Sequence, residues 1–417
     1  MLETVLPLER PVSKTPDNGE PSSSLADRVT LDAVGRTIVN SWTSEHLTQV
    51  AESSNKHFQL IIMPTEQCNF RCTYCYEDYE AGWMKPETIS AIKRLLKRRV
   101  IDLETLTISW FGGEPLLAKR TVFDISTCAA ELASQHPQLQ LRGGMTTNGY
   151  FLDYETASAL AGCGVTEYQI SLDGPSEVHD KTRLRADGQG TYERIWENLM
   201  AIRKSSLPVS VLLRVHFSAD TVASLDRLID DIKTQLLADS RFSVAFKAIG
   251  RWGGTNDAAT QVLSREKRDQ VTALFAARLF GENPASPQNV SHLDGYVCYA
   301  SRPNSLVIRA NGDIGKCTVA LYDERNKVGT LLPDGTIRLI PGRLAPWVRG
   351  LETLDAKTLS CPRSGMLSQR NPLHVLADGY GTNKNTTERG AVPAEVEVVA
   401  VNGKPTRPAL QIAPTST

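Results

Sequence analysis

Short apolar segments alternate with amphipathic segments through the middle of the chain. Six apolar runs have strand length and are rich in Val, Ile, Leu and aromatic residues; they are residues 58–64, 106–111, 139–147, 167–173, 208–217 and 242–249. Several stretches between them have helical periodicity; they are residues 85–100, 223–237 and 264–280. Strand and helix units repeated in this order predict an α/β fold, a partial (β/α)6 TIM-like barrel with a parallel sheet inside its helices.

The pattern changes near residue 290. Residues 305–317 and 327–340 read as short strands joined by Asn-Gly and Asp-Gly turns. We therefore predict a barrel over residues 56–285 and a small β-rich domain over residues 286–375. Residues 1–55 contain a polar, Pro/Ser-rich stretch and are predicted to be partly disordered, and residues 376–417 are predicted to form a tail of low order.

Composition narrows the class of protein. The chain has 417 residues, 41% hydrophobic and 22% charged, as expected for a globular protein of more than one domain. A formal net charge of −1 favours neither nucleic acid nor an anionic membrane as partner. No apolar run approaches the roughly 20 residues of a membrane span, and the N-terminus lacks a secretory signal. We predict a cytoplasmic protein whose clustered cysteines are metal ligands.

Three of the eight cysteines fall within CNFRCTYC, directly after the first predicted strand. Barrels carry their chemistry at this end of the strands. Thiolates suit zinc, copper(I) and iron–sulfur clusters. Structural zinc normally takes four protein ligands, and no second arm lies nearby. A [4Fe–4S] cube normally takes four cysteines, so Cys68, Cys72 and Cys75 would leave one iron open. A zinc loop and clustering by chance stay as alternatives on these residues alone.

Motifs at the ends of the next strands make the pattern more specific. They are FGGEP at residues 111–115, TTNGY at 146–150 and SLDGP at 171–175. With CNFRCTYC, they resemble the radical S-adenosylmethionine (SAM) superfamily over about residues 56–250. The resemblance implies a [4Fe–4S] cluster on the three cysteines, with SAM chelating the fourth iron. One electron then cleaves SAM to methionine and a 5′-deoxyadenosyl radical, which abstracts hydrogen from a substrate.

The resemblance also implies residues that bind SAM. Its GGE stretch holds the amino group, where glycines allow close backbone approach and Glu114 could accept a hydrogen bond. Ser171 and Arg183 bind SAM as well; alone, Arg183 would read as a solvated surface arginine. Residues 246–254 are expected to line the adenine side or the substrate entrance. The expected cofactor-binding residues are Tyr74, Gly112, Gly113, Glu114, Asn148, Ser171, Asp173 and Arg183.

The C-terminal cysteines carry a second resemblance. The stretch CYASRPNSLVIRANGDIGKC is similar to the start of a SPASM or Twitch extension, which binds auxiliary [4Fe–4S] clusters in enzymes that modify peptides and proteins. Full SPASM domains have more cysteines, so at most one auxiliary cluster is expected, on Cys298, Cys317 and Cys361. The alternative is a degenerate domain with ordinary buried thiols.

The remaining ligands and cysteines are less defined. The fourth ligand of the auxiliary cluster stays open, with His292, Asp294 and Tyr296 as candidates. Cys128 and Cys163 are expected to be small core residues.

The resemblance implies a radical SAM oxidoreductase and peptide maturase. The expected reaction joins side chains of a ribosomal precursor peptide through a C–C bond, as in a cyclophane, or a C–X bond. The expected partners are that peptide and a reductant such as flavodoxin or ferredoxin. The alternatives are an anaerobic sulfatase-maturing enzyme that forms formylglycine, a peptide epimerase, and an iron–sulfur scaffold or electron-transfer protein without SAM chemistry. No catalytic base is assigned.

Overall fold

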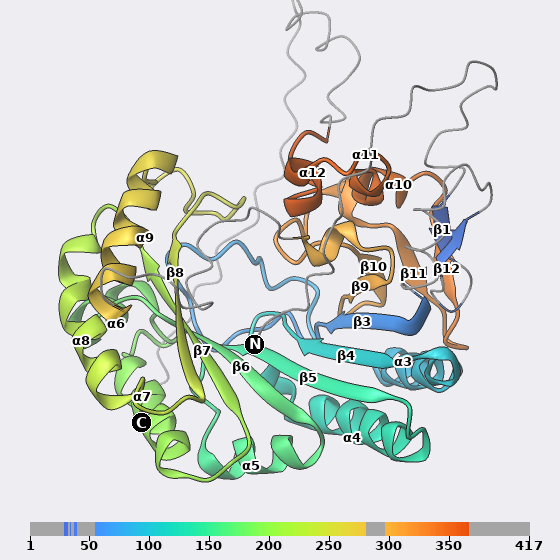
Figure 1. Ribbon diagram of the computed structural model, residues 1–417, viewed down its shortest axis with the longest axis horizontal. Coiled ribbons are helices and arrows are strands. Elements are labelled where there is room, and N and C mark those ends of the chain that lie inside the picture. Colours follow the sequence, from blue (N-terminus) through green and yellow to red (C-terminus); the bar gives the residue numbers. More distant parts are fainter. Residues whose placement is uncertain (1–28, 32–33, 35–36, 40–54, 281–296, 367–417) are drawn as a thin grey trace, which may run out of the picture. The chain divides into compact units, whose positions relative to one another are not determined.

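The fold is built on one large mixed sheet. The computed structural model describes residues 29–31, 34, 37–39, 55–280 and 297–366 (Figure 1). Within these residues, the sheet has ten strands in the order β12-β11-β10-β9-β3-β4-β5-β6-β7-β8. Its parallel half comprises β3 (His57–Ile62), β4 (Thr105–Trp110), β5 (Gln140–Thr147), β6 (Val165–Leu172), β7 (Ser210–Phe217) and β8 (Phe242–Ala248). The predicted α/β class with a partial parallel barrel is confirmed.

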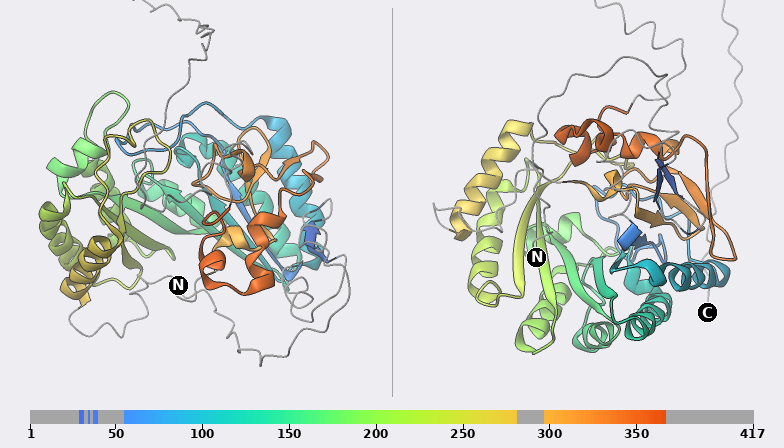
Figure 2. Two further views of the ribbon diagram at one scale, coloured as in Figure 1. Left: turned by 90° about the horizontal axis from the view of Figure 1, so that it is seen from above. Right: turned by 45° about the vertical axis from the view of Figure 1, so that its right-hand side comes forward.

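Helices cover the outer face of this parallel half (Figures 1 and 2). They are α3 (Pro86–Arg99), α4 (Lys119–Gln135), α5 (Tyr154–Gly162), α6 (Ser176–Thr182), α7 (Tyr192–Lys204), α8 (Leu225–Gln235) and α9 (Arg265–Phe280). In α3 the predicted apolar stripe faces inward, because Ile92 and Leu96 are fully buried. Pro86 occupies its first turn and basic residues its last, as helix ends prefer.

The two faces of each parallel strand have different roles, and β7 shows this most clearly. Its buried residues alternate along the strand; they are Val211, Leu213, Val215 and Phe217. The intervening positions lie on the opposite face, because side chains alternate along a strand. Arg214 and His216 therefore share the inner face of the barrel.

The C-terminal segment extends the barrel sheet. Strand β9 (Ser305–Ile308) pairs in parallel with β3, and the antiparallel strands β10 (Asp313–Gly315), β11 (Gly329–Leu331) and β12 (Ile337–Leu339) follow. The two predicted hairpins are thus present, and main-chain pairing joins them to the barrel. Short helices end the segment; they are α10 (Ala345–Val348), α11 (Gly350–Thr353) and α12 (Ala356–Ser360).

Single 3-10 turns complete the connections. They are η1 (Val100–Asp102), η2 (Pro115–Ala118), η3 (Val222–Ser224), η4 (Tyr299–Ser301) and η5 (Glu324–Asn326). Inside the predicted N-terminal extension, β1 (Val29–Leu31) and β2 (Thr37–Val39) pair as an antiparallel sheet of their own. The predicted tail and the candidate ligands His292, Asp294 and Tyr296 lie outside the described residues. Of the helices in the described ranges, none has both the length and the apolarity to cross a bilayer.

Candidate active site

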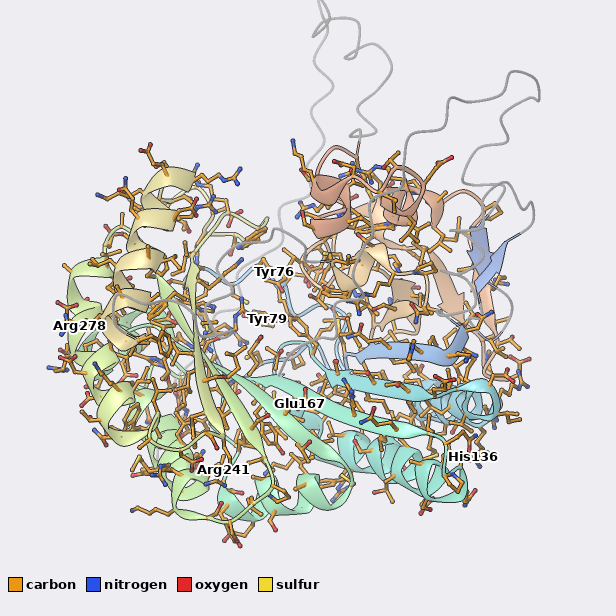
Figure 3. All side chains as sticks on the ribbon, viewed as in Figure 1. Tyr76, Tyr79, His136, Glu167, Arg241 and Arg278 are labelled. Carbon is orange, nitrogen blue, oxygen red and sulfur yellow. The ribbon has the colours of Figure 1, made fainter. Side chains whose placement is uncertain are left out.

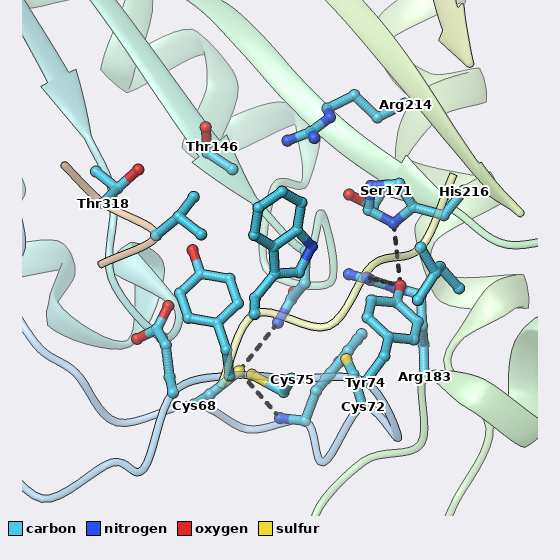
Figure 4. A pocket seen from close by; sticks show the side chains of 18 of the residues that line it. Cys68, Cys72, Tyr74, Cys75, Thr146, Ser171, Arg183, Arg214, His216 and Thr318 are labelled. Carbon is cyan, nitrogen blue, oxygen red and sulfur yellow. Dashed lines mark hydrogen bonds between the residues drawn. The ribbon is translucent and has the colours of Figure 1, made fainter. Parts of the chain in front are cut away.

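The loop that follows β3, here called the cysteine loop (residues 63–85), forms one wall of a cavity of about 320 Å³. Cys68, Cys72 and Cys75 all line this cavity (Figure 4). Burial raises the pKa of each thiol, to about 12 for Cys72. In the described part of the chain, no three His, Cys, Asp or Glu side chains are close enough to share a single metal ion. All three thiols lie at the same end of the cavity (Figure 4).

Tyr74, between the second and third cysteines, ties the cysteine loop to the barrel. Its hydroxyl lies 2.9 Å from Asp173 Oδ1, 2.9 Å from Arg183 Nη1, which donates to it, and 3.0 Å from His216 Nδ1. The second carboxylate oxygen of Asp173 accepts from Thr182 Oγ1 at 2.7 Å. Burial opposes the charge on Asp173, but His216 and the Arg183 guanidinium outweigh it and hold the pKa of this carboxyl well below its ordinary value. The network fixes the cysteine loop against the ends of β6 and β7.

The GGE stretch packs against the cysteine loop, since Glu114 N donates to Gln67 O at 2.9 Å. The Glu114 carboxylate is fully buried and accepts from Leu116 N at 2.9 Å, Thr147 Oγ1 at 2.8 Å and Asn148 N at 2.7 Å. Glu114 does not line the cavity. These bonds hold Glu114 against Asn148, and Oε2, which has one donor in the described part of the chain, keeps a lone pair for a further donor. The contact of Glu114 with an ammonium group stays a prediction.

Gly113 of this stretch also packs closely against the cysteine loop. A Cβ on Gly113 would lie 2.4 Å from the carbonyl oxygen of Gln67, next to Cys68. The absence of a side chain on Gly113 therefore lets the main chain of this stretch lie directly against the cysteine loop. Gly112 and Gly113 still line the cavity.

The other predicted cofactor-binding residues divide into two groups. Tyr74, Asn148, Ser171 and Arg183 line the cavity, whereas Asp173 is absent from its wall because it is occupied in holding Tyr74. Arg183 is only 7% exposed, so it is not a solvated surface arginine. Its Nε is buried with no hydrogen-bond partner in the described part of the chain.

Several cavity residues were not among the predicted cofactor-binding residues. Arg214 and His216 project from β7, and Thr146 from β5 (Figure 4). Lys247 and Trp252 come from the end of β8 and the loop after it, within residues 246–254, which were expected to line the site. The alternation on β7 was the signal that could have found Arg214 and His216.

The motifs now lie around one cavity, and residues 62–232 match the family model described as Radical SAM superfamily. The chain carries a radical SAM superfamily domain. Proteins with this domain use a [4Fe–4S] cluster and SAM. The matched range includes the whole cysteine loop, the GGE stretch and Arg183.

Relatives of the radical SAM domain have more than one activity. A GTP 3′,8-cyclase of Microcystis aeruginosa is 27% identical over 319 residues, 72% of this chain and 91% of the relative. A cysteine-type anaerobic sulfatase-maturating enzyme of Clostridium novyi is 25% identical over 202 residues, 45% of this chain and 50% of the relative. Native anSMEcpe with bound AdoMet and Cp18Cys peptide is similar in structure, with a TM-score of 0.50, 20% identity, and coverage of 69% of this chain and 80% of that one. The structural likeness supports the fold alone.

The residues of the radical SAM domain fit the cofactors of the family. The three thiols are soft donors of the kind that iron–sulfur clusters take. The unpartnered Nε of Arg183 offers a charged donor to a carboxylate such as that of SAM. Ser171 lines the same cavity.

A second cysteine set, Cys298, Cys317 and Cys361, gathers beside the radical SAM domain. The amide of Cys298 donates to Leu359 O at 2.9 Å, two residues before Cys361. Burial and the nearby charges of Cys317 and Cys361 raise the pKa of Cys298 to about 11. Thr318, next in the chain to Cys317, lines the main cavity (Figure 4). The three cysteines of the second set do not themselves line this cavity, and the segment after Cys317 reaches it through Thr318 and Val319.

The two remaining thiols lie in the barrel core, as expected. Cys163 is buried, and Cys128 is half-buried and packs against the core.

Proposed function

We propose that this chain is a radical SAM peptide maturase that joins side chains of a ribosomal precursor peptide. The observation that carries the proposal is the position of both cysteine sets beside one cavity. That cavity runs from the cysteine loop to Thr318 and Val319. A substrate inside it would lie between the first cysteine set and Thr318, the neighbour of Cys317.

In this proposal, each group of residues has one task. Cys68, Cys72 and Cys75 hold the [4Fe–4S] cluster, while Ser171 and Arg183 hold the SAM carboxylate. Bound in this way, cluster and cofactor supply the reductive cleavage that removes a hydrogen atom from an unactivated carbon. Tyr74 keeps the cysteine loop in register with the barrel, since its hydroxyl contacts three side chains of other segments.

In this proposal, the second cysteine set holds the group that accepts an electron from the substrate. Formation of a cross-link removes two hydrogens from the peptide and makes one C–C or C–X bond. One hydrogen atom would go to the 5′-deoxyadenosyl radical, which becomes 5′-deoxyadenosine. The other hydrogen would leave as a proton, with its electron passing to an acceptor. An auxiliary [4Fe–4S] cluster on Cys298, Cys317 and Cys361 would be that acceptor, and flavodoxin or ferredoxin would supply the first electron.

Tyr76 and Tyr79, both labelled in Figure 3, line the cavity from the cysteine loop. Burial raises the pKa of both phenols well above the ordinary value, and Tyr76 feels the charges of both Cys75 and Cys317. This part of the cavity wall is thus aromatic and neutral, which suits a peptide better than a highly charged ligand at that end of the cavity.

A nucleotide substrate is the second candidate. Its support is the likeness to a GTP 3′,8-cyclase that covers 91% of that relative's length. Formylglycine formation and peptide epimerisation, with support from the sulfatase-maturating relative for the former, are variants of the peptide proposal.

Product mass separates these reactions. The reduced holoenzyme would be incubated with SAM and, in parallel, with GTP or with short peptides encoded beside its gene. We expect a peptide product lighter by two hydrogens, with a side-chain link that survives tandem mass spectrometry fragmentation. A product of unchanged mass would indicate epimerisation, and consumption of GTP with no peptide product would contradict the proposal.

A further inference from the structure

Two basic side chains stand on the cavity wall without a counter-charge. Arg214 projects from β7 into the cavity, on the side away from the cysteines (Figure 4), and Lys247 lines the cavity from β8. The β6–β7 and β7–β8 registers set Ser171 opposite Arg214 and His216 opposite Lys247. Unlike Arg183, which donates to Tyr74, neither side chain makes a hydrogen bond or ion pair to another described residue.

The acidic groups nearby do not neutralise these cations. Asp173 is committed to Tyr74 and Thr182. Glu77 is the carboxyl among the residues that line the cavity, and in the described part of the chain it forms no ion pair with Arg214 or Lys247. Arg214 is half-buried, and burial lowers its pKa, whereas Lys247 is exposed on the cavity wall. A pair of cations so placed is stabilised by an anion that enters from outside.

The adjoining wall is apolar and rigid. Trp252 lines the cavity and is 40% exposed. The loop that carries Trp252 packs against the cysteine loop. Asn256 Nδ2 donates to Thr73 O at 3.0 Å. Gly254 approaches the main chain closely, since a Cβ at this position would lie 2.3 Å from Cys75 O. An exposed indole beside two cations offers an apolar surface and a charged contact to the same ligand.

We infer that Arg214 and Lys247 bind a carboxylate of the peptide substrate, and so select a peptide with an acidic group near the carbon that reacts. The inference rests on the proposed function, since it names the substrate class of the same cavity. The guanidinium fork of Arg214 matches a carboxylate in two-point geometry, and Lys247 adds a point charge at the next strand. The SAM carboxylate has its own donor in Arg183, on the cysteine side of the cavity.

Equilibrium binding to the unreduced holoenzyme with SAM present tests the inference. The probes are acetylated, amidated Gly/Ala peptides with a central Asp or a central Asn, and the Asn peptide with a free C-terminal acid. We expect the Asp peptide to bind about tenfold or more tightly than the amidated Asn peptide, because a charge-assisted pair is worth more than a neutral one. Tight binding of the free-acid peptide instead would assign the contact to a terminal carboxylate and would also support the inference.

Matched variants assign the effect to the two cations. R214Q and K247Q should each weaken the Asp peptide about tenfold, and the charge-retaining R214K and K247R should recover part of that loss. K267Q, which removes an exposed lysine of α9, should leave the affinity unchanged. Thermal unfolding would verify that every variant is folded.

Three results would overturn the inference. The first is equal affinity for the Asp and amidated Asn peptides, including no measurable binding of either. The second is a loss of SAM affinity in R214Q as large as the loss for the Asp peptide, which would give Arg214 to the cofactor. The third is GTP binding that depends on Arg214 when the Asp peptide does not bind. Binding needs no reductant, so a failure here is distinct from a failure to cleave SAM.

Discussion

The two cysteine sets differ in how the fold holds them. The first lies on a single loop whose main chain is paired to a neighbouring segment: Arg71 N donates to Leu184 O at 2.7 Å, and Thr73 N to Thr182 O at 2.9 Å. The second comes from three separate segments with short elements. In the second set, the side chain of Asn326 holds the main chain of Cys317. Its Oδ1 accepts from Cys317 N at 2.8 Å, and its Nδ2 donates to Cys317 O at 2.8 Å.

This difference matches the tasks that we propose for the two sets. A loop locked to the barrel presents three thiols in constant positions to a cofactor that must be oriented for chemistry. A set assembled from distant segments depends on the packing of β9–β12 and the helices after them. The first set should therefore control SAM cleavage, and the second should control only what happens to the substrate afterwards.

The largest effect is expected for C72A. Removing this thiolate takes a ligand from the proposed cluster, so SAM cleavage should fall to the level of protein without iron. The measurement is 5′-deoxyadenosine released after reduction in the presence of SAM. C128A, which changes a half-buried thiol outside the cavity, is the matched control and should behave as the unaltered chain. Full cleavage by C72A would refute the assignment of the first set.

C317A should separate the two sets. We expect SAM cleavage to continue while peptide modification is lost, because the thiol belongs to the proposed electron acceptor. The iron content should fall from about eight to about four atoms per chain, the difference of one cube. A native iron content of about four would mean that the second set holds no cluster, and equal loss of both activities would indicate a folding role.

Y74F tests the hydrogen bonds by which Tyr74 holds the cysteine loop against the barrel. The change removes one hydroxyl and leaves Asp173, Arg183 and His216 without a shared partner. We expect the free energy of unfolding to fall by about 1–3 kcal/mol, the cost of leaving buried polar groups unpaired. SAM should also bind more weakly, since Arg183 loses the hydroxyl that orients it. The matched control is Y154F, at an exposed tyrosine of α5, and equal stability of Y74F and Y154F would contradict this contribution of Tyr74.

The smallest effect is a change in pH dependence at His179, which is fully buried behind the SLDG turn. Its Nδ1 accepts from Asp173 N at 3.3 Å, and burial lowers its pKa to about 4. The folded state therefore favours the neutral ring, so this contribution to stability is complete above about pH 6.5 and is lost as the pH falls toward 4. Denaturant unfolding at a series of pH values should show a shallower decline in H179Q than in the unaltered chain. Parallel declines would contradict this role.

Sequence patterns predicted the barrel and the place of its first cysteine set well. Each of the six predicted strands overlaps an observed one, because long apolar runs identify buried strands of a parallel sheet. The position of Cys68, Cys72 and Cys75 followed from the rule that barrels carry their sites at this end of the strands. Both inferences need only local sequence and a general rule of topology.

The remaining features depend on contacts between distant segments. The Glu114 carboxylate accepts from the amide of Asn148, directly after β5, and no local pattern indicates this contact. The parallel pairing of β9 with β3 joins segments at opposite ends of the chain, and no local pattern indicates it. Arg214 lay within a recognised strand, but its lack of a counter-charge became visible only when the cavity was assembled.

The most direct test of the central claim is the electron paramagnetic resonance spectrum of the reduced protein with and without SAM. If the cysteine loop leaves one iron open for the cofactor, SAM should change the spectrum of the cluster on Cys68, Cys72 and Cys75. The change should persist in C317A, where the second set is removed. A reduced-cluster spectrum that SAM leaves unaltered would contradict the account.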